Sequence, residues 1–170
     1  EFGHSAGDEV LKQFCTLIES ICRSSDYFIR WGGEEFLIIT RFVDRKTASE
    51  LADRIITLTA GFDFKINTEH AIRRTCSLGF TCFPFCRQFP DTLNWSECIM
   101  LADKALYAAK NNGRNAWVGL SCNERPESSS RPEAQNLLSA IITNTGEQIE
   151  LGTVSVMSSI SDSSKLHWND

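Results

Sequence analysis

One short stretch decides the fold of this chain: Arg30-Trp31-Gly32-Gly33-Glu34-Glu35-Phe36. It lies between two apolar runs, residues 27–29 and residues 36–39, which are short, rich in aromatic or β-branched side chains and free of proline. That pattern is typical of strands. Two adjacent glycines between strands provide the positive φ that a two-residue hairpin turn requires. The sequence therefore predicts a β-hairpin with Glu34 and Glu35 at its tip.

The predicted tip combines two features that suit a phosphate ligand. Neighbouring carboxylates repel one another, and a divalent cation that arrives with a polyphosphate turns that repulsion into binding. Glycine has no Cβ, so the backbone at Gly32 and Gly33 can approach a ligand closely. For this motif taken alone, a polar hairpin tip without a ligand is the more common interpretation. Evidence from the rest of the chain is therefore needed to favour a phosphate-binding tip.

Composition indicates one hydrophobic core followed by a tail. The chain has 170 residues, of which 42% are hydrophobic, and a net charge of −5. This charge disfavours a nucleic-acid polymer as partner, although a single nucleotide needs only a local positive patch. The sequence contains no run of 18 apolar residues and no N-terminal signal pattern. We expect a cytoplasmic protein, or a cytoplasmic piece of a longer signalling protein because the first residue is not Met, with no membrane segment in this chain.

The seven cysteines show no C-x-x-C spacing, and several fall on apolar faces. We therefore predict buried free thiols in a reducing compartment and no zinc site. The cysteines are Cys15, Cys22, Cys76, Cys82, Cys86, Cys98 and Cys122.

The remaining regular elements follow from periodicity. Apolar residues at three- and four-residue steps predict a first helix that opens at Gly7-Asp8 and leaves Gln13 in water. The same spacing predicts two more helices, and alternation predicts three more strands. The predicted ranges are 46–60 and 95–110 for the helices, and 62–66, 76–82 and 115–120 for the strands.

The C-terminal section changes character. Residues 122–133 are rich in Ser, Pro, Glu and Arg, which is typical of a linker. A short helical pattern over 133–142 and a hairpin pattern over 141–151 follow, and residues 155–170 read as a polar, frayed end. We therefore expect a domain over 1–120 and a Ser-rich linker or tail over 121–170, partly disordered.

Four further segments lie in order around the hairpin motif. Together with Arg30 to Phe36 they closely resemble the GGDEF domain, the catalytic domain of diguanylate cyclases, in its Gly-Gly-Glu-Glu-Phe variant. The resemblance covers residues 1 to about 120. The segments are Phe2-Gly3-His4-Ser5-Ala6-Gly7-Asp8, Cys76-Ser77-Leu78-Gly79-Phe80, Ala102-Asp103-Lys104-Ala105-Leu106-Tyr107-Ala108-Ala109-Lys110 and Asn112-Gly113-Arg114-Asn115.

The resemblance implies an α/β (α+β) fold of the nucleotide-cyclase, ferredoxin-like type, with a central, mostly antiparallel sheet flanked by helices. It also implies condensation of two GTP molecules into cyclic di-GMP, with release of two pyrophosphates, by a homodimer that uses Mg²⁺ or Mn²⁺. In this reading Glu34 and Glu35 are catalytic, Glu34 binds the metal, and Gly32 and Gly33 lie against the nucleotide.

Residues outside the tip receive roles by the same resemblance. Asp8 would bind the guanine base, although an acidic residue near a helix start is also a simple cap. Lys110 and Arg114 would neutralise the triphosphate, although both also read as ordinary charges at a helix end.

The resemblance further implies an inhibitory site for the product at Arg23, Asp26 and Arg54. A guanidinium fork matches phosphate or the Hoogsteen edge of guanine, and a carboxylate matches the guanine N–H edge. Taken alone, Arg23-Ser24-Ser25-Asp26 is also what a helix end followed by a turn looks like.

One departure from the family is large. The family domain begins with a strand that carries a metal-binding aspartate, then part of a helix, and neither has a counterpart before Phe2. We therefore expect unpaired strand edges, and poor or no turnover of GTP by this chain alone. A catalytically incompetent module that binds GTP or cyclic di-GMP is the alternative function, and a purely structural α/β domain with chance motifs is a third.

Overall fold

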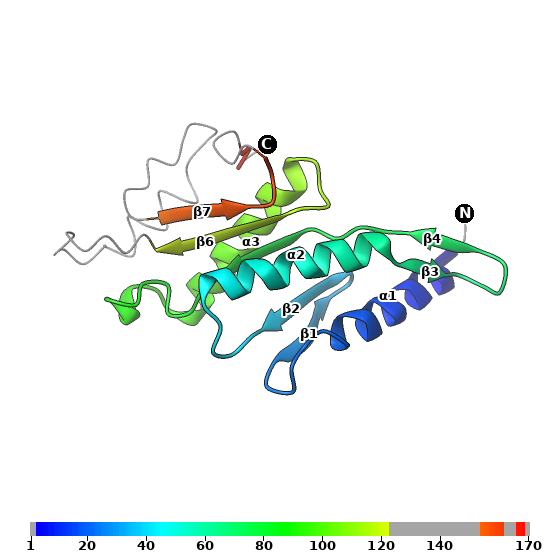
Figure 1. Ribbon diagram of the computed structural model, residues 1–170, viewed down its shortest axis with the longest axis horizontal. Helices are drawn as coiled ribbons and strands as arrows, with labels where there is room; N and C mark the ends of the chain where they lie inside the picture. The colour runs from blue at the N-terminus through cyan, green and yellow to red at the C-terminus, as the bar shows by residue number, and fades with distance from the viewer. Residues whose placement is uncertain (1–2, 123–153, 162–165, 169–170) are drawn as a thin grey trace. The chain divides into compact units, whose positions relative to one another are not determined.

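The computed structural model describes residues 3–122, 154–161 and 166–168. It divides into two compact units, residues 1–44 with 57–75 and residues 45–56 with 76–170. The division falls within one helix, and the placement of the units relative to one another is not determined (Figure 1). In chain order the elements are α1 (Gly3–Glu19), β1 (Tyr27–Gly32), β2 (Glu35–Ile39), α2 (Arg45–Gly61), β3 (Asp63–Lys65), β4 (Ala71–Arg73), β5 (Leu78–Thr81), η1 (Pro90–Thr92), α3 (Trp95–Asn111), β6 (Trp117–Cys122) and β7 (Val154–Ser158).

The first unit contains α1 and two antiparallel hairpins, β1–β2 and β3–β4. The predicted hairpin around the two glycines is confirmed, with Tyr27 opposite Ile39 and Arg30 opposite Phe36. Phe36 also packs on Phe14 of α1, with ring centroids 5.2 Å apart. Phe14 therefore joins α1 to the hairpin at Phe36.

The start of α1 and the environment of Gln13 differ from the predictions. The helix begins at Gly3 rather than at Gly7, because the small and polar residues before Gly7 continue the helical backbone. Gln13 is half-buried rather than wet. Its amide nitrogen donates to the Lys65 carbonyl at 2.7 Å, and its amide oxygen accepts from the Lys65 N–H at 2.9 Å. Gln13 thus satisfies both backbone groups of Lys65, as a neighbouring strand would.

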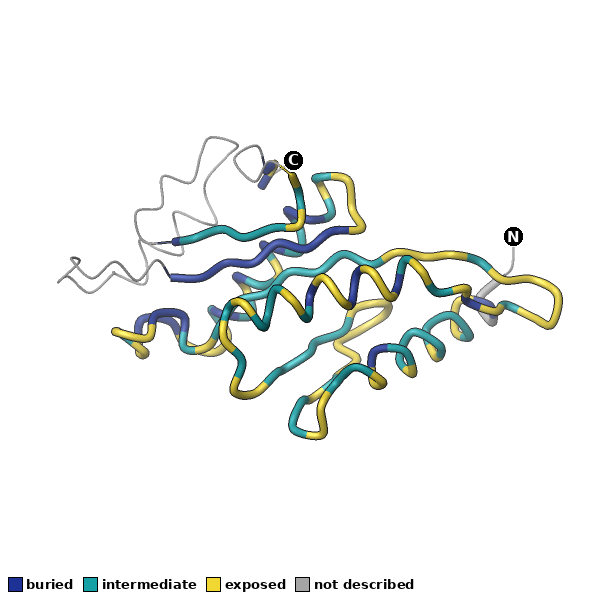
Figure 2. Tube along the Cα trace, viewed as in Figure 1, coloured by how far each residue is buried: buried dark blue, intermediate teal, exposed yellow. Residues whose placement is uncertain are grey.

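The second unit is built on a three-stranded sheet in the order β5-β6-β7. Strands β5 and β6 are parallel and are joined through α3, as parallel neighbours require a crossover. Gly79 lets β5 approach α3 closely, because a Cβ at this position would lie 2.1 Å from the Ala102 carbonyl oxygen. Strand β6 is buried along its whole length (Figure 2).

Local signals fix the start of α3 where the sequence predicted it. The Asn94 side chain accepts a hydrogen bond from the Glu97 N–H at 3.0 Å, and Glu97 Oε2 accepts from the Asn94 N–H at 2.7 Å. This capping box satisfies two N–H groups that a helix start leaves open. The helix places Cys98, Leu101 and Ala105 in the core of the second unit.

The fold class is confirmed as mixed α and β, but the pairing differs from a single, mostly antiparallel sheet. Among the described residues the hydrogen bonds form three separate sheets, of which two have only two strands. The sequence prediction also overlooked β4, because the three residues Ala71–Arg73 are too few to show a period.

The prediction of a frayed C-terminal end is wrong for residues 155–158. They belong to β7, which pairs with β6 from Val118 opposite Ser158 to Cys122 opposite Val154. The strand was overlooked because its alternation is masked by polar serines, and its partner lies far away in the sequence. Leu166 and Trp168 are also buried in this unit. The predicted linker is wrong at its first residue, because Cys122 belongs to β6. The rest of that linker, the helical pattern of 133–142 and the hairpin pattern of 141–151 lie outside the described residues.

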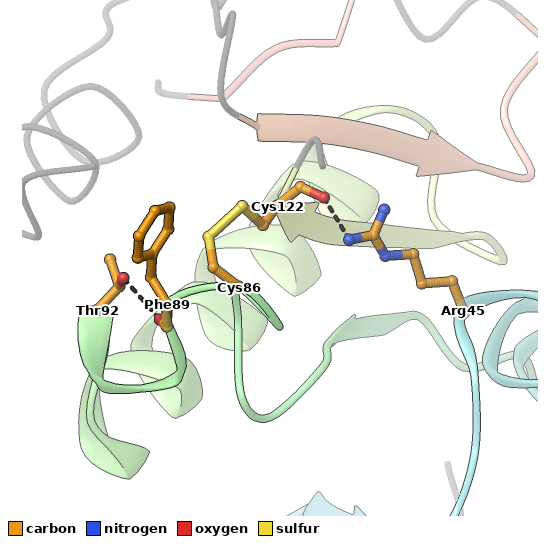
Figure 3. Close-up of a disulfide and its surroundings, with 5 residues drawn as sticks. All are labelled: Arg45, Cys86, Phe89, Thr92 and Cys122. Atoms are coloured by element: carbon orange, nitrogen blue, oxygen red, sulfur yellow. Dashed lines mark hydrogen bonds between the residues drawn. A yellow bond between two sulfur atoms is a disulfide. The ribbon is translucent and has the colours of Figure 1, made fainter. Parts of the chain in front are cut away.

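The cysteine prediction is wrong at two positions. Cys86, in the loop after β5, and Cys122, at the end of β6, form a disulfide with Cα atoms 5.1 Å apart (Figure 3). The Cys122 carbonyl also accepts a hydrogen bond from Arg45 Nη2. Sequence spacing could not reveal the pair, because only the sheet brings these positions together. The other five cysteines are free, and Cys98 is the buried one among them.

Candidate functional site

The hairpin tip places two glycines and two acids in a defined turn. Gly32 ends β1 opposite Glu35, so Gly33 and Glu34 are the two loop residues. Gly33 has a φ of 52°, which glycine adopts without the steric penalty of a Cβ. Elsewhere in the described chain, the non-glycine residues with positive φ are Phe42, Arg114 and Asn115, so Glu34 keeps an ordinary negative φ. A positive φ at only the first loop position is the sign pattern of a type II′ turn.

The structure requires glycine at only one of these two positions. Gly33 needs its left-handed backbone, whereas Gly32 has no positive φ. A Cβ built on Gly32 meets no atom within 4 Å, so packing does not require glycine there either. Because Gly32 has no side chain, the space beside the two acids is open.

Arg30 holds this turn from the side. Its Nε and Nη2 atoms both donate to the carbonyl oxygen of Gly33, at 3.0 Å and 2.7 Å. Arg30 begins the predicted motif, but no role was predicted for it. The signal that could have identified it is a residue with a forked donor three positions before a flexible turn glycine.

The acids at the tip fit a metal that a substrate shares. Glu34 and Glu35 are exposed carboxylates, the oxygen donors that Mg²⁺ and Mn²⁺ prefer. Within the described part of the chain, no group of three or more His, Cys, Asp or Glu residues could hold a metal ion. The tip therefore does not form an all-protein cage, but Mg²⁺ is usually held by one or two carboxylates together with substrate phosphates.

Arg23 and Asp26 lie together on the turn before β1. The Arg23 N–H donates to Asp26 Oδ2 at 2.8 Å, and the Asp26 N–H donates to the Arg23 carbonyl at 3.0 Å. The Asp26 carboxylate thus stabilises its own turn, while Arg23 is exposed. Six residues of β1 separate this turn from the loop glycine, a span of about 20 Å at the usual strand rise. The two predicted sites on this hairpin are therefore physically distinct.

Asp8 is exposed on α1 in the same unit. Because α1 begins at Gly3, Asp8 lies in the second turn of the helix and not at its cap. The capping interpretation of Asp8 is therefore wrong, and its role toward guanine stays a prediction.

Lys110 and Arg114 lie together at the end of α3. Lys110 is in the last turn, and the helix ends at Asn111, one residue beyond the predicted range of 95–110, with Asn112 as its C-cap. The Arg114 N–H donates to the Ala109 carbonyl at 3.1 Å, which is the long bond of a Schellman motif after Gly113. Arg114 itself has a φ of 58°, a conformation that costs an L-residue roughly 1–2 kcal/mol. Such local strain is concentrated at functional sites, which favours a role for this arginine.

The other predicted residue of the second unit is Arg54, which is exposed on α2. Because Arg54, Lys110 and Arg114 belong to the second unit, the predictions that they face the tip or Arg23 remain predictions. No helix among the described residues has both the length and the apolar character needed to cross a membrane.

Comparison with known proteins gives a match over most of the chain. Residues 1–116 match the family model described as "Diguanylate cyclase, GGDEF domain". The chain is 34% identical over 126 residues to Diguanylate cyclase A of Treponema denticola, covering 74% of this chain and 32% of that protein. It is 36% identical over 114 residues to DgcM of Escherichia coli, covering 67% of this chain and 25% of that protein. It is 34% identical over 119 residues to the response regulator PleD of Caulobacter vibrioides, covering 69% and 25%.

Two solved structures are similar in fold. One is the diguanylate cyclase SiaD of Pseudomonas aeruginosa in complex with its activator SiaC, with a TM-score of 0.57, 28% identity and coverage of 67% of this chain and 41% of that chain. The other is the active GGEEF domain of a diguanylate cyclase from Vibrio cholerae, with a TM-score of 0.52, 32% identity and coverage of 67% and 68%. The chain spans about a quarter to a third of the length of the curated relatives named above, 25% to 32%. These matches confirm the resemblance drawn from the five motifs.

Proposed function

Because the chain belongs to the GGDEF family of diguanylate cyclases, we propose that it is a domain that condenses two GTP molecules into cyclic di-GMP and releases two pyrophosphates. The observation that carries this proposal is the hairpin tip, where Gly33 turns the backbone and Gly32 leaves open space beside Glu34. A backbone without side chains next to exposed acids suits a nucleotide triphosphate that brings a cation with it.

Each remaining residue of the proposed site has a chemical task. The acceptor-only carboxylate of Asp8 binds the N–H edge of guanine. Lys110 and Arg114 supply positive charge to the triphosphate, and their common position at the end of α3 supports a joint role. Gly32 and Gly33 lie against the nucleotide.

The proposed cofactor is Mg²⁺ or Mn²⁺, held by Glu34 with the help of Glu35 and by phosphate oxygens of the substrate. When bound there, the cation would stabilise negative charge on the α-phosphate and would lower the pKa of the attacking hydroxyl. The fit rests on the exposed oxygen donors of the tip and on the small number of protein ligands that Mg²⁺ needs when phosphates complete its shell.

The reaction requires two copies of the domain. The 3′-oxygen of one GTP forms a bond to the α-phosphorus of the other, the bond to pyrophosphate breaks, and the hydroxyl proton leaves to solvent. The 3′-oxygen of the second nucleotide then bonds to the α-phosphorus of the first. This step closes the ring and releases the second pyrophosphate and a proton. Since one domain holds one GTP, we propose a homodimer in which two tips face one another, so that catalysis depends on positioning.

We also propose that cyclic di-GMP inhibits its own synthesis by binding at Arg23, Asp26 and Arg54. The separation of Arg23 and Asp26 from the tip by the length of β1 supports a second site rather than part of the first. Because GTP is the substrate, we place the domain in the cytoplasm.

Nucleotide binding and turnover test the proposal together. The chain is titrated with GTP in the presence of Mg²⁺, and cyclic di-GMP and pyrophosphate are followed by chromatography. We expect cation-dependent binding of GTP that Glu34→Ala abolishes. Binding that is the same with Glu34→Ala, or independent of the cation, would overturn the assignment. If GTP binds with the cation but neither this chain nor a longer protein that contains it forms cyclic di-GMP, the domain is a GTP-binding module and not a cyclase.

The inhibitory site is tested separately with cyclic di-GMP. We expect Arg23→Ala to lose binding of cyclic di-GMP while binding of GTP with Mg²⁺ stays as in the unchanged chain. Loss of both signals would show that the two nucleotides share one site.

A further inference from the structure

The Gly33 carbonyl receives two hydrogen bonds from one side chain. Nε and Nη2 of Arg30 lie 3.0 Å and 2.7 Å from this oxygen. The same peptide group contains the nitrogen of Glu34, the proposed metal ligand. Whatever fixes the Gly33 carbonyl therefore also fixes the plane from which the Glu34 side chain projects.

The tip requires such a constraint, because its other restraints are weak. Glycine populates several backbone conformations with similar energies, so Gly32 and Gly33 do not hold the turn by themselves. A Cβ at either position would meet no atom within 4 Å, so packing does not hold it either. The strand register also shifts between Arg30 and Gly32, which interrupts the regular ladder just before the turn.

Arg30 is itself attached to the rigid part of the first unit. It lies directly opposite Phe36 on β2, and residues directly opposite share one face of the sheet. Phe36 stacks with Phe28 and packs against Phe14 of α1, with both pairs of centroids 5.2 Å apart.

We propose that Arg30 is a positioning residue that clamps the Gly33–Glu34 peptide to the α1-supported face of the hairpin and so presents the Glu34 carboxylate to the metal. This inference rests on the proposed function. A guanidinium suits the task because its planar fork places two donors on one oxygen, whereas an ammonium is a single point charge on a flexible stem. Residues that hold metal ligands in place affect metal affinity without touching the metal.

Arg30→Lys tests the clamp, since it keeps the charge and loses the fork. Arg74→Lys is the matched control, because Arg74 is an exposed arginine of the same unit whose Nη1 donates to the neighbouring Arg73 carbonyl, at 3.2 Å. Two quantities are measured on the full chain: amide hydrogen exchange at Glu34 and Glu35, and the affinity for Mn²⁺ in the presence of GTP by electron paramagnetic resonance.

We expect Arg30→Lys to speed exchange at the tip by about tenfold, the effect of losing one charge-assisted hydrogen bond. We expect it to weaken Mn²⁺ binding on the order of tenfold, as loss of support for a metal ligand does. Arg74→Lys should change neither quantity by more than about twofold, the scale of an exposed surface substitution.

Two outcomes would overturn the inference, and a third separates it from the proposed function. Unchanged tip exchange in Arg30→Lys would show that the bonds to Gly33 do not hold the turn. Faster exchange with Mn²⁺ affinity equal to that of Arg74→Lys would show that the clamp does not serve the metal. If Glu34→Ala leaves the Mn²⁺ affinity unchanged, Glu34 does not bind the metal and the proposed function fails. The claim that Arg30 presents Glu34 to the metal then fails as well, whatever effect Arg30→Lys has on amide exchange at the tip.

Discussion

Replacing each tip glycine in turn by alanine separates backbone strain from ligand access. Both substitutions reduce the conformational entropy of the unfolded chain by the same amount, which stabilises the native state by about 0.4–1 kcal/mol where the native backbone is tolerated. Neither added methyl group meets an atom within 4 Å, so neither creates a clash in the chain. The two variants therefore differ in the folded state mainly through φ.

The magnitude follows from the φ of Gly33, which is 52°. An L-residue in that left-handed region costs roughly 1–2 kcal/mol. The entropy gain is common to both variants and cancels in the comparison. We therefore expect Gly33→Ala to have a free energy of unfolding about 1–2 kcal/mol lower than Gly32→Ala, and Gly32→Ala to be as stable as the unchanged chain or slightly more stable.

Urea unfolding followed by circular dichroism measures this difference in unfolding free energy. Titration with GTP and Mg²⁺ measures whether the nucleotide can still reach the space beside the two acids. Under the proposed function, Gly32→Ala keeps its stability but loses affinity for GTP, because its methyl group occupies the space beside the acids. Gly61→Ala is the control, since Gly61 is an exposed glycine of the same unit with an ordinary φ and open surroundings, far along the chain from the tip. It should retain full GTP affinity.

Equal unfolding free energies for the two tip variants would refute the strain argument. A less stable Gly32→Ala would show that the turn places its positive φ elsewhere. A stable Gly32→Ala with full GTP affinity would refute the role of the open space and leave the strain argument intact.

Three further predictions concern the second unit. Gly79→Ala should lower the free energy of unfolding by at least about 1–3 kcal/mol, because its Cβ would lie 2.1 Å from backbone atoms of α3. Thermal unfolding of Gly79→Ala, compared with that of Gly61→Ala, measures this loss. The disulfide closes a segment with a sequence separation of 36, so replacing Cys86 and Cys122 together by serine should cost about 3–4 kcal/mol. A reducing agent should then destabilise the unchanged chain in urea but not the double variant, and equal sensitivity would contradict the pairing. Burial raises the pKa of the Cys98 thiol from 9.0 to about 11. The unfolded thiol ionises first, so this contribution to stability is complete below pH 9 and is lost as the pH rises to about 11. Urea unfolding across that interval should show a smaller decline in Cys98→Ala than in the unchanged chain, and equal declines in the two would contradict the role of Cys98.

The sequence alone determined the features that are encoded within a few neighbouring residues. The two short apolar runs on either side of Gly32 and Gly33 predicted the hairpin, and the positive φ at Gly33 follows from the chemistry of tight turns. The capping box at Asn94 and the glycine after Asn112 set the ends of α3 within one residue of the prediction. The five ordered motifs identified the family, which the comparison over residues 1–116 confirms.

Only the tertiary structure decided the features that join distant parts of the chain. Gln13 bonds to Lys65 across 52 residues, Cys86 pairs with Cys122 across 36, and β7 adds to β6 although its own sequence shows no clear period. The role of Arg30 depends on its two donors reaching the Gly33 carbonyl, which is seen only in the folded hairpin. Turns and caps depend on backbone preferences that each residue brings with it, whereas these contacts depend on which surfaces meet after the whole chain has folded.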